Sequence, residues 1–179
     1  MERRLLSRCF GVIVILLPAS QPGIIDEMRI PLKLLDPDLP VPAHTHAGDA
    51  GVDLHTREDA TLDPGQWIVL PTGVAIALPD GYAALVLARS GLAAKKGLGV
   101  LNAPGLVDSG YRGEIKVILI NHGREPVQVD RGERIAQLVV TPVVLQEFEV
   151  VADLPESERG KGGLGSSGVT AERKGGFPA

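Results

Sequence analysis

The sequence has few aromatic residues, a single cysteine and no excess of positive charge. Aromatic side chains make up 3% of its 179 residues, so a buried core must be built from Val, Leu, Ile and Ala. The lone Cys9 excludes an intramolecular disulfide framework, and the four scattered histidines do not have the spacing of a zinc site. A net charge of −4 argues against a general nucleic-acid binder, because such a protein needs a basic surface to displace counterions.

Glycine and proline are abundant by contrast, with 22 and 14 residues, and they separate short apolar runs rich in β-branched side chains. This pattern favours strands joined by turns over long helices. About eight to ten strands at this spacing are typical of an antiparallel barrel or jelly roll, so we predict an all-β fold. One short helix is predicted at Ser90–Lys96, ended by Gly97. The predicted strands cover residues 29–35, 66–70, 73–78, 82–87, 114–120, 127–129, 135–140 and 143–148.

Two stretches in the first half of the chain carry groups suited to a metal ion and to phosphate. Asp49 and Asp53 are four residues apart, on one face if the stretch is extended, and Mg²⁺ takes few carboxylates while keeping its waters. The alternative is a turn closed by an aspartate side chain. Arg89, Ser90 and Gly91 join a predicted strand to the predicted helix, where N–H groups, a hydroxyl and a guanidinium suit a phosphate. The alternative is that Ser90 only caps the helix.

The stretch from Asn102 to Lys116 holds the largest number of chemically useful residues. A Pro-Gly pair, two hydrophobic residues and then Asp-Ser-Gly-Tyr predict a hairpin with functional groups at its tip. Its backbone and the Asn102 amide can pair with the edge of a nucleobase, and Asp108 is a candidate general base for activating water. The alternative is a purely structural hairpin in which Asp108 has no chemical role.

Two further stretches are weaker by themselves. Gln137 lies on a predicted strand between two apolar residues, where an exposed polar side chain is ordinary. Residues 159–168 are rich in Gly and Ser and carry Arg159 and Lys161 at one end, a composition that can wrap a polyphosphate. This segment lacks the Gly-Lys-Ser/Thr ending of a P-loop, so without further context a mobile tail is the default interpretation.

Taken together and in this order, the five stretches resemble the five motifs of the trimeric dUTPase family. The resemblance spans about residues 29–169. It implies a jelly-roll-like β-barrel and a homotrimer whose active sites draw on all three chains. It also implies Mg²⁺-assisted hydrolysis of dUTP to dUMP and pyrophosphate, a reaction that supplies dUMP and keeps uracil out of DNA.

The resemblance further implies a role for each matching residue. Asp108 would hold the attacking water, and Tyr111 would pack beneath the deoxyribose and exclude a 2′-hydroxyl. Asp53 would orient Mg²⁺ through its waters, with Asp49 near it. The residues implied around uracil are Asn102, Leu106, Val107 and Lys116. Those implied at the phosphates are Arg89, Ser90, Gly91, Gln137, Arg159, Ser166 and Ser167.

One departure from the family pattern concerns the tail. Members of the family usually have Phe or His where this chain has Leu164, and Leu offers contact with uracil but no aromatic face for stacking. A dUTP-binding module without turnover is therefore one alternative. A dCTP deaminase of the same fold is another, but such an enzyme would need a different sequence motif in place of Tyr-Arg-Gly-Glu-Ile-Lys at 111–116.

The chain is predicted to have three regions: an extension at 1–27, a β-barrel domain at 28–155 and a mobile tail at 156–179. The extension has the basic, apolar and small-residue order of a secretory signal and is too short to span a bilayer. Alternatively, translation starts at Met28, directly before the first predicted strand. We favour the later start, because a cytoplasmic nucleotide enzyme has no use for export, and we expect no membrane or nucleic-acid partner.

Overall fold

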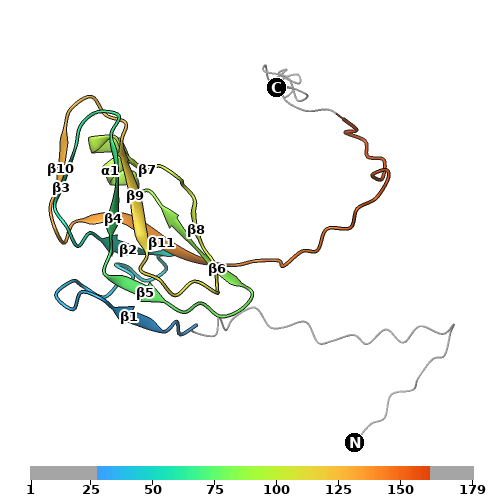
Figure 1. Ribbon diagram of the computed structural model, residues 1–179, viewed down its shortest axis with the longest axis horizontal. Coiled ribbons are helices and arrows are strands. Elements are labelled where there is room, and N and C mark those ends of the chain that lie inside the picture. Colours follow the sequence, from blue (N-terminus) through green and yellow to red (C-terminus); the bar gives the residue numbers. More distant parts are fainter. Residues whose placement is uncertain (1–27, 162–179) are drawn as a thin grey trace, which may run out of the picture. The chain divides into compact units, whose positions relative to one another are not determined.

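The structure is a computed structural model, and it describes residues 28–161. In this range the chain forms strands and one short helix (Figure 1). The elements are β1 Leu32–Leu34, β2 Gly51–His55, β3 Ala60–Leu62, β4 Trp67–Pro71, β5 Val74–Ile76, β6 Tyr82–Leu87, α1 Ser90–Lys96, β7 Leu98–Val100, β8 Gly105–Val107, β9 Lys116–Asn121, β10 Val127–Val129 and β11 Arg134–Pro142. By its internal contacts the chain divides into two units, Met1–Val143 and Val144–Ala179, and the first contains all of these elements.

The strands pair in four antiparallel sheets. The largest has the order β2-β11-β6-β8, the next has the order β4-β9-β7, and two-stranded sheets join β1 to β5 and β10 to β3. Most neighbours in these sheets come from distant parts of the chain, as in a jelly roll. The predicted all-β, jelly-roll-like fold with one short helix is therefore confirmed, although the described strands form separate sheets and not one continuously hydrogen-bonded barrel.

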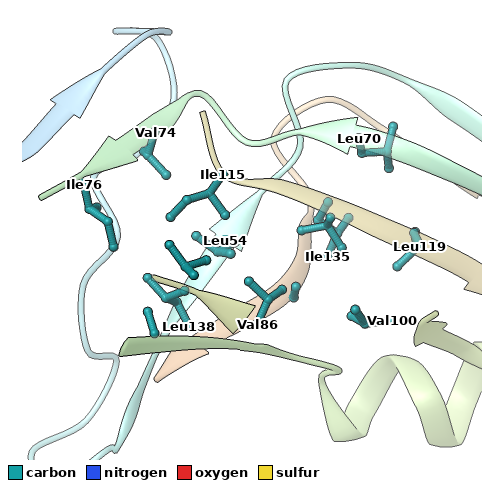
Figure 2. Close-up of a cluster of buried hydrophobic side chains, with 14 of the residues drawn as sticks. Leu54, Leu70, Val74, Ile76, Val86, Val100, Ile115, Leu119, Ile135 and Leu138 are labelled. Atoms are coloured by element: carbon teal, nitrogen blue, oxygen red, sulfur yellow. The ribbon is translucent and has the colours of Figure 1, made fainter. Parts of the chain in front are cut away.

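An aliphatic core joins the sheets (Figure 2). Leu54 of β2, Leu70 of β4 and Ile135 of β11 are almost completely buried, and they come from three different parts of the sequence. Every fully buried member of this cluster is Leu, Val, Ile or Ala, as the scarcity of aromatic residues predicts. Burying one such large side chain contributes about 1.5–3 kcal/mol, so this cluster is the main source of the fold's stability.

The predicted helix is present at Ser90–Lys96, and Gly97 ends it in the left-handed conformation with a φ of 68°. A Cβ at Gly97 would also lie 2.7 Å from the backbone nitrogen of Gly123, so both the conformation and the available space require glycine. The predicted strands at 82–87 and 127–129 match β6 and β10 residue for residue. Among residues 28–161, no helix is long and apolar enough to cross a membrane.

The strand predicted at 143–148 is not formed. Val144, Leu145 and Phe148 are 85%, 82% and 89% exposed, and the segment has no strand assignment. An apolar run forms a strand only where another strand satisfies its backbone hydrogen bonds, and no described strand pairs with this segment, although the Val143 N–H donates to the Gly81 carbonyl at 2.9 Å. The prediction therefore fails for lack of a pairing partner.

The predicted hairpin is also wrong in its pairing. β8 pairs with β6 in the four-stranded sheet, whereas β9 pairs with β4 and β7. Pairing with β6 leaves Leu106 exposed and buries Val107 in the core, which satisfies the alternation of β8. Residues 108–115 therefore form a loop that crosses from one sheet to another, and the functional groups expected at a hairpin tip lie on that crossing loop.

Candidate active site

A cavity of about 260 Å³ lies beside the crossing loop. Its apolar lining includes Val69 of β4, Val86 of β6 and Ile118 of β9, so it sits where the two larger sheets meet. Six sequence-predicted residues line it together: Asn102, Leu106, Val107, Asp108, Tyr111 and Lys116. We call this space the loop cavity. It combines apolar walls with a carboxylate, an amide and a phenol, as small-molecule sites commonly do.

The crossing loop holds Asp108 and Tyr111 in a fixed relationship. The Tyr111 N–H donates to the Asp108 carbonyl at 3.1 Å, which closes a turn. The Tyr111 hydroxyl donates to the carbonyl of Glu114 at 2.9 Å, so the ring lies back over its own loop. A Cβ on Gly113 would lie only 2.4 Å from the Tyr111 hydroxyl oxygen. Glycine at 113 is therefore what allows the ring to take this position.

A second cavity, of about 560 Å³, lies where β2, β11 and the β6–α1 junction come together. Six sequence-predicted residues line it: Asp49, Asp53, Arg89, Ser90, Gly91 and Gln137. Three lining residues that the sequence did not predict are Arg134, Thr45 and His46. The sequence position of Arg134 could have indicated a role, because this residue begins β11 and lies three residues before Gln137. We call this space the cationic cavity.

Charge in the cationic cavity is organised around Asp53. Its Oδ1 lies 2.7 Å from Nε of Arg89, and its Oδ2 lies 3.2 Å from Nη1 of Arg134. Arg89 also donates to the Arg134 carbonyl at 3.2 Å, and the Gln137 amide donates to the Ala88 carbonyl at 2.9 Å. Two guanidinium groups share the Asp53 carboxylate, so positive charge is concentrated at Arg89 and Arg134, while the other carboxylate of the lining, Asp49, is bound in a turn. Such a site can bind an anion such as phosphate.

Ser90 is free of the capping role that was its alternative interpretation. The N-cap position of α1 is held by Arg89, and no side chain caps the helix. Ser90 is instead the first helical residue and is exposed on the lining of the cationic cavity. Its hydroxyl and the first N–H groups of the helix can therefore both serve a bound anion.

Asp49 and Asp53 occupy different local structures. Asp49 precedes β2 in a turn, where its carboxylate accepts the His46 N–H at 2.8 Å, so the turn interpretation holds for it. Asp53 lies within β2 with its side chain 18% exposed. Within the part of the chain described, no group of three or more His, Cys, Asp or Glu residues could hold a metal ion. The donor set suits an ion such as Mg²⁺, which keeps most of its waters and needs few protein ligands.

Next to the cationic cavity, His55 has its pKa lowered below the usual value. Burial is the largest cause, the charges of Arg134 and Arg89 act in the same direction, and Asp53 opposes them. Burial and nearby cations both disfavour a protonated imidazole. His55 therefore adds no further positive charge to this region near neutral pH.

The two cavities have no lining residue in common. Within one chain, the groups predicted for the base and sugar are thus gathered in one place and those predicted for the phosphates in another. Arg159 lies in the second compact unit, after residue 143. Leu164, Ser166 and Ser167 lie outside the described residues.

The family model for dUTPase matches residues 38–168, which include both cavities and the five motif stretches. The chain belongs to the dUTPase family. It is 60% identical to a deoxyuridine 5′-triphosphate nucleotidohydrolase of Streptomyces griseus over 138 residues, covering 76% of this chain and 78% of the relative. It is 52% identical to that of Corynebacterium glutamicum over 147 residues, covering 82% of this chain and 99% of the relative.

Solved dUTPase structures have the same fold. The dUTPase of Staphylococcus bacteriophage 80alpha with dUpNHpp superimposes with a TM-score of 0.74 at 31% identity, over 79% of this chain and 99% of that chain. A mutant dUTPase from phage phi11 of S. aureus superimposes with a TM-score of 0.67 at 25% identity, over 72% of this chain and 100% of that chain. That second structure is described as revealing the coordination of a structural Mg(II) ion.

Proposed function

We propose that this dUTPase-family chain hydrolyses dUTP to dUMP and pyrophosphate with Mg²⁺ as cofactor. The proposal rests on the different chemical groups that line the two cavities. The loop cavity offers apolar walls and hydrogen-bonding groups for a base and sugar, and the cationic cavity offers paired guanidinium groups for phosphates. The names of the relatives agree with this substrate.

Recognition of the nucleoside is assigned to the loop cavity. Asn102 and the backbone at Leu106 and Val107 would pair with the uracil edge, with Lys116 beside them. Rejecting thymine for one extra methyl group by hydrophobic contact alone is worth only about 1–3 kcal/mol, so a rigid backbone wall that clashes with the methyl is needed. Tyr111 would lie beneath the deoxyribose, where its held ring leaves no room for a 2′-hydroxyl.

Asp108 would act as the general base of the reaction. It would take a proton from a water molecule as the water oxygen bonds to the α-phosphorus. The bond from the α-phosphorus to the bridging oxygen then breaks, and pyrophosphate leaves with that oxygen. Phosphoryl transfer depends mainly on positioning and on neutralising charge, which matches a site with one candidate base, Asp108, and cations at Arg89 and Arg134.

We assign the phosphates to Arg89, Ser90, Gly91 and Gln137, and we add Arg134 because it lines the same cavity. Bound Mg²⁺ would supply charge neutralisation at the phosphates. Asp53 would hold it through water, because both of its oxygens already accept from guanidinium groups. Asp49 would be a weaker neighbour, and Arg159, Leu164, Ser166 and Ser167 of the tail would close over the nucleotide.

We further propose a homotrimer with shared active sites. The loop cavity and the cationic cavity have separate linings in one chain, so joining them into one nucleotide site calls for a second copy. A surface suited to such a contact follows β4, where Trp67, Ile68 and Val69 are 59%, 36% and 44% exposed. Val69 pairs with Ile118 of β9, and both also line the loop cavity. An exposed apolar strand at the mouth of a cavity favours burial by another protein chain.

We also propose that the enzyme acts in the cytoplasm, because the nucleotide pools that contain its substrate are cytoplasmic.

One assay tests the proposed activity. Pyrophosphate release is measured with dUTP, dCTP and UTP, with and without Mg²⁺, alongside the mass of the particle by light scattering. We expect Mg²⁺-dependent release from dUTP only, from a particle three times the mass of the chain. Ammonia released from dCTP would favour the deaminase, and tight dUTP binding without release would favour a binding module.

A further inference from the structure

Glu114 is a charged residue of the loop cavity to which the proposed mechanism gives no task. Its side chain is only 15% exposed, and it lies at the end of the crossing loop that carries Asp108 and Tyr111. Burying a carboxylate to this degree is costly unless it is paired. Hydrogen bonds and ion pairs to the Glu114 carboxylate must therefore offset this cost.

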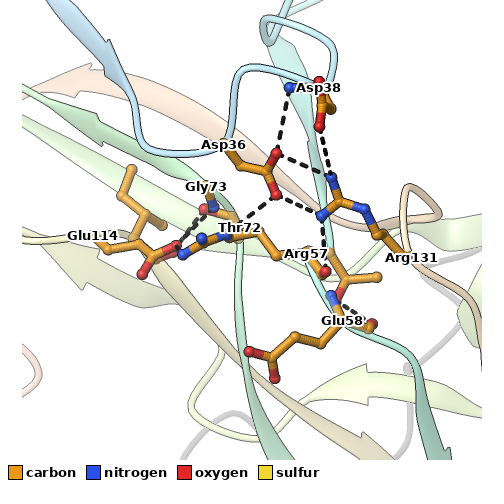
Figure 3. A network of polar contacts seen from close by, with 10 residues as sticks. Asp36, Asp38, Arg57, Glu58, Thr72, Gly73, Glu114 and Arg131 are labelled. Atoms are coloured by element: carbon orange, nitrogen blue, oxygen red, sulfur yellow. Dashed lines mark hydrogen bonds and ion pairs between the residues drawn. The ribbon is translucent and has the colours of Figure 1, made fainter.

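The carboxylate of Glu114 joins two other segments of the chain. Its Oε1 accepts the Gly73 N–H at 2.8 Å and the Nη1 of Arg57 at 3.2 Å, as Figure 3 shows. Gly73 lies in the turn between β4 and β5, and Arg57 lies between β2 and β3. The next residue, Ile115, is bound to the same turn, because its carbonyl accepts from the Thr72 hydroxyl at 2.6 Å. The end of the crossing loop is thus fastened to the rest of the fold at Glu114.

Arg57 is itself held from its other side. Its Nε lies 3.4 Å from Oδ2 of Asp36, so one guanidinium bridges Asp36 and Glu114. Asp36 is 8% exposed and also accepts from Arg131, which lowers its pKa to about 2 and keeps it charged. The pKa of Arg57 is raised in turn, first by its hydrogen bond to Glu114. A planar guanidinium between two fixed carboxylates is a stiff support, which a lysine could not match.

The support reaches Tyr111 through the backbone of Glu114. The carbonyl of Glu114 is the group that accepts the Tyr111 hydroxyl at 2.9 Å. A shift of Glu114 would therefore move the acceptor that fixes the phenol ring of Tyr111, a residue that is 46% exposed.

We propose that Arg57 and Glu114 form a positioning pair that holds Tyr111 in place and thereby sets the preference for deoxyribose over ribose in the nucleotide. This inference rests on the proposed function, in which the Tyr111 ring excludes a 2′-hydroxyl. Neither residue of the pair transfers a proton or contacts phosphate. The pair acts through Tyr111, so its loss affects the choice between sugars more than the rate of the chemical step.

The test compares kcat and KM for dUTP and UTP in the full-length protein with Mg²⁺. The variants are Arg57→Gln, Glu114→Gln and the double variant, since glutamine keeps the approximate shape and removes the charge. We expect each single variant to lower the ratio of kcat/KM for dUTP over UTP about tenfold, mainly through a lower KM for UTP, because a Tyr111 ring that is no longer held would leave room for the 2′-hydroxyl. The effects of substitutions at two contacting residues do not add, so the ratio in the double variant should be about as low as in the more affected single variant.

Arg131→Gln is the matched control. Arg131 binds Asp36 at the opposite end of the same network, and its hydrogen bond to Arg57 goes to the backbone carbonyl, at 2.9 Å, and not to the guanidinium group that holds Glu114. This control should lower the melting temperature while leaving the ratio of dUTP over UTP within about twofold of wild type.

The outcomes separate the inference from the function beneath it. Arg57→Gln and Glu114→Gln proteins that melt earlier but keep the wild-type ratio would overturn the positioning role and leave the proposed function standing. A wild-type protein that does not hydrolyse dUTP, or hydrolyses UTP equally well, would overturn both. If Glu114→Gln does not fold, Arg57→Gln decides the question alone. The Arg57 side chain is 34% exposed, and its replacement leaves the Gly73 N–H bound to Glu114, so this variant should fold.

Discussion

Asp53 and Arg89 form a close ion pair, with 2.7 Å between Oδ1 and Nε, although 35 residues separate them in the sequence. The register of β11 brings them together. Gln137 of β11 lies opposite Asp53 of β2 on one side and opposite Leu87 of β6 on the other, and Arg89 follows two residues after Leu87. Three of the motif stretches thus meet because one strand pairs with two others. A slip of one residue in β11 would turn Gln137 to the opposite face.

This geometry predicts different effects for the two aspartates of the cationic cavity. Asp53→Asn removes the charge shared by Arg89 and Arg134, so kcat/KM for dUTP should fall about 10–100-fold and half-maximal activity should need more Mg²⁺. Asp49→Asn keeps an oxygen that can accept the His46 N–H, so its activity should stay within about twofold of wild type. Mg²⁺ titrations of the two variants check this. Equal losses in both would contradict the separate assignments.

The second prediction concerns the general base. Asp108→Ala should lower kcat by about 10²–10⁴-fold while the Kd for dUTP changes little, because the proton is transferred only in the transition state. Single-turnover hydrolysis and equilibrium binding of dUTP measure the two quantities. Asp80→Ala is the control, since Asp80 is an exposed turn residue outside both cavities. An Asp108→Ala enzyme with wild-type kcat would refute the assigned role.

Local features of the fold follow from the sequence more reliably than long-range pairings. The helix at Ser90–Lys96 and its end at Gly97 were predictable, because capping and conformation depend on neighbouring residues. Strands of three residues, such as Ala60–Leu62 and Leu98–Val100, are too short to produce a recognisable alternation. The partner of β8 was not predictable either, because the strand it pairs with is decided by burial in the whole fold.

The candidate site divides in the same way. The motif residues of both cavities could be chosen from the sequence through their family pattern, and the structure brings each set together. A role for Glu114 could not be predicted from the sequence, because it depends on contact with Arg57, which is 57 residues away and belongs to no motif. A role that arises from contact between distant residues leaves no local pattern to read.

A third prediction concerns acid stability. The pKa of Asp36 is lowered from 3.8 to about 2, chiefly by its hydrogen bond to Arg131. A carboxyl with a lowered folded-state pKa stabilises the fold fully above its unfolded value and loses this contribution as the pH falls through its folded value. The difference in unfolding free energy between wild type and Asp36→Asn should therefore be largest above about pH 4 and should close towards about pH 2.

Thermal or denaturant unfolding across that pH range measures the difference. Asp38→Asn is the control, because its side chain is 88% exposed and its nearest approach to Arg131 is 4.0 Å. That variant should follow the wild-type curve at every pH. A gap between wild type and Asp36→Asn that persists unchanged at pH 2 would mean that the charge of Asp36 is not what stabilises the network.

The fourth prediction concerns the tail. Truncation after Glu158 removes Arg159, Leu164, Ser166 and Ser167 and should lower kcat/KM about 10³-fold, an effect of the size seen when a phosphate-binding arginine is lost. The fold should persist, because every described strand and the helix belong to the unit that ends at Val143. Truncation after Gly168 keeps the whole motif and should retain activity. Circular dichroism and pyrophosphate release compare the two, and equal activity would mean that the motif stretch takes no part.

The last prediction concerns Leu164, where the family pattern that this sequence resembles usually has Phe or His. Leu164→Phe should lower the KM for dUTP about two- to tenfold, because a ring stacked on uracil adds about 0.5–1.5 kcal/mol beyond the area it buries. Leu164→Ile is the control, since it keeps an aliphatic side chain and should leave KM close to wild type. Initial rates over a range of dUTP concentrations measure both. If KM instead rises in the Phe variant and stays low in the Ile variant, the pocket that receives the tail is shaped for a branched aliphatic side chain, and stacking on uracil is not part of closure in this enzyme.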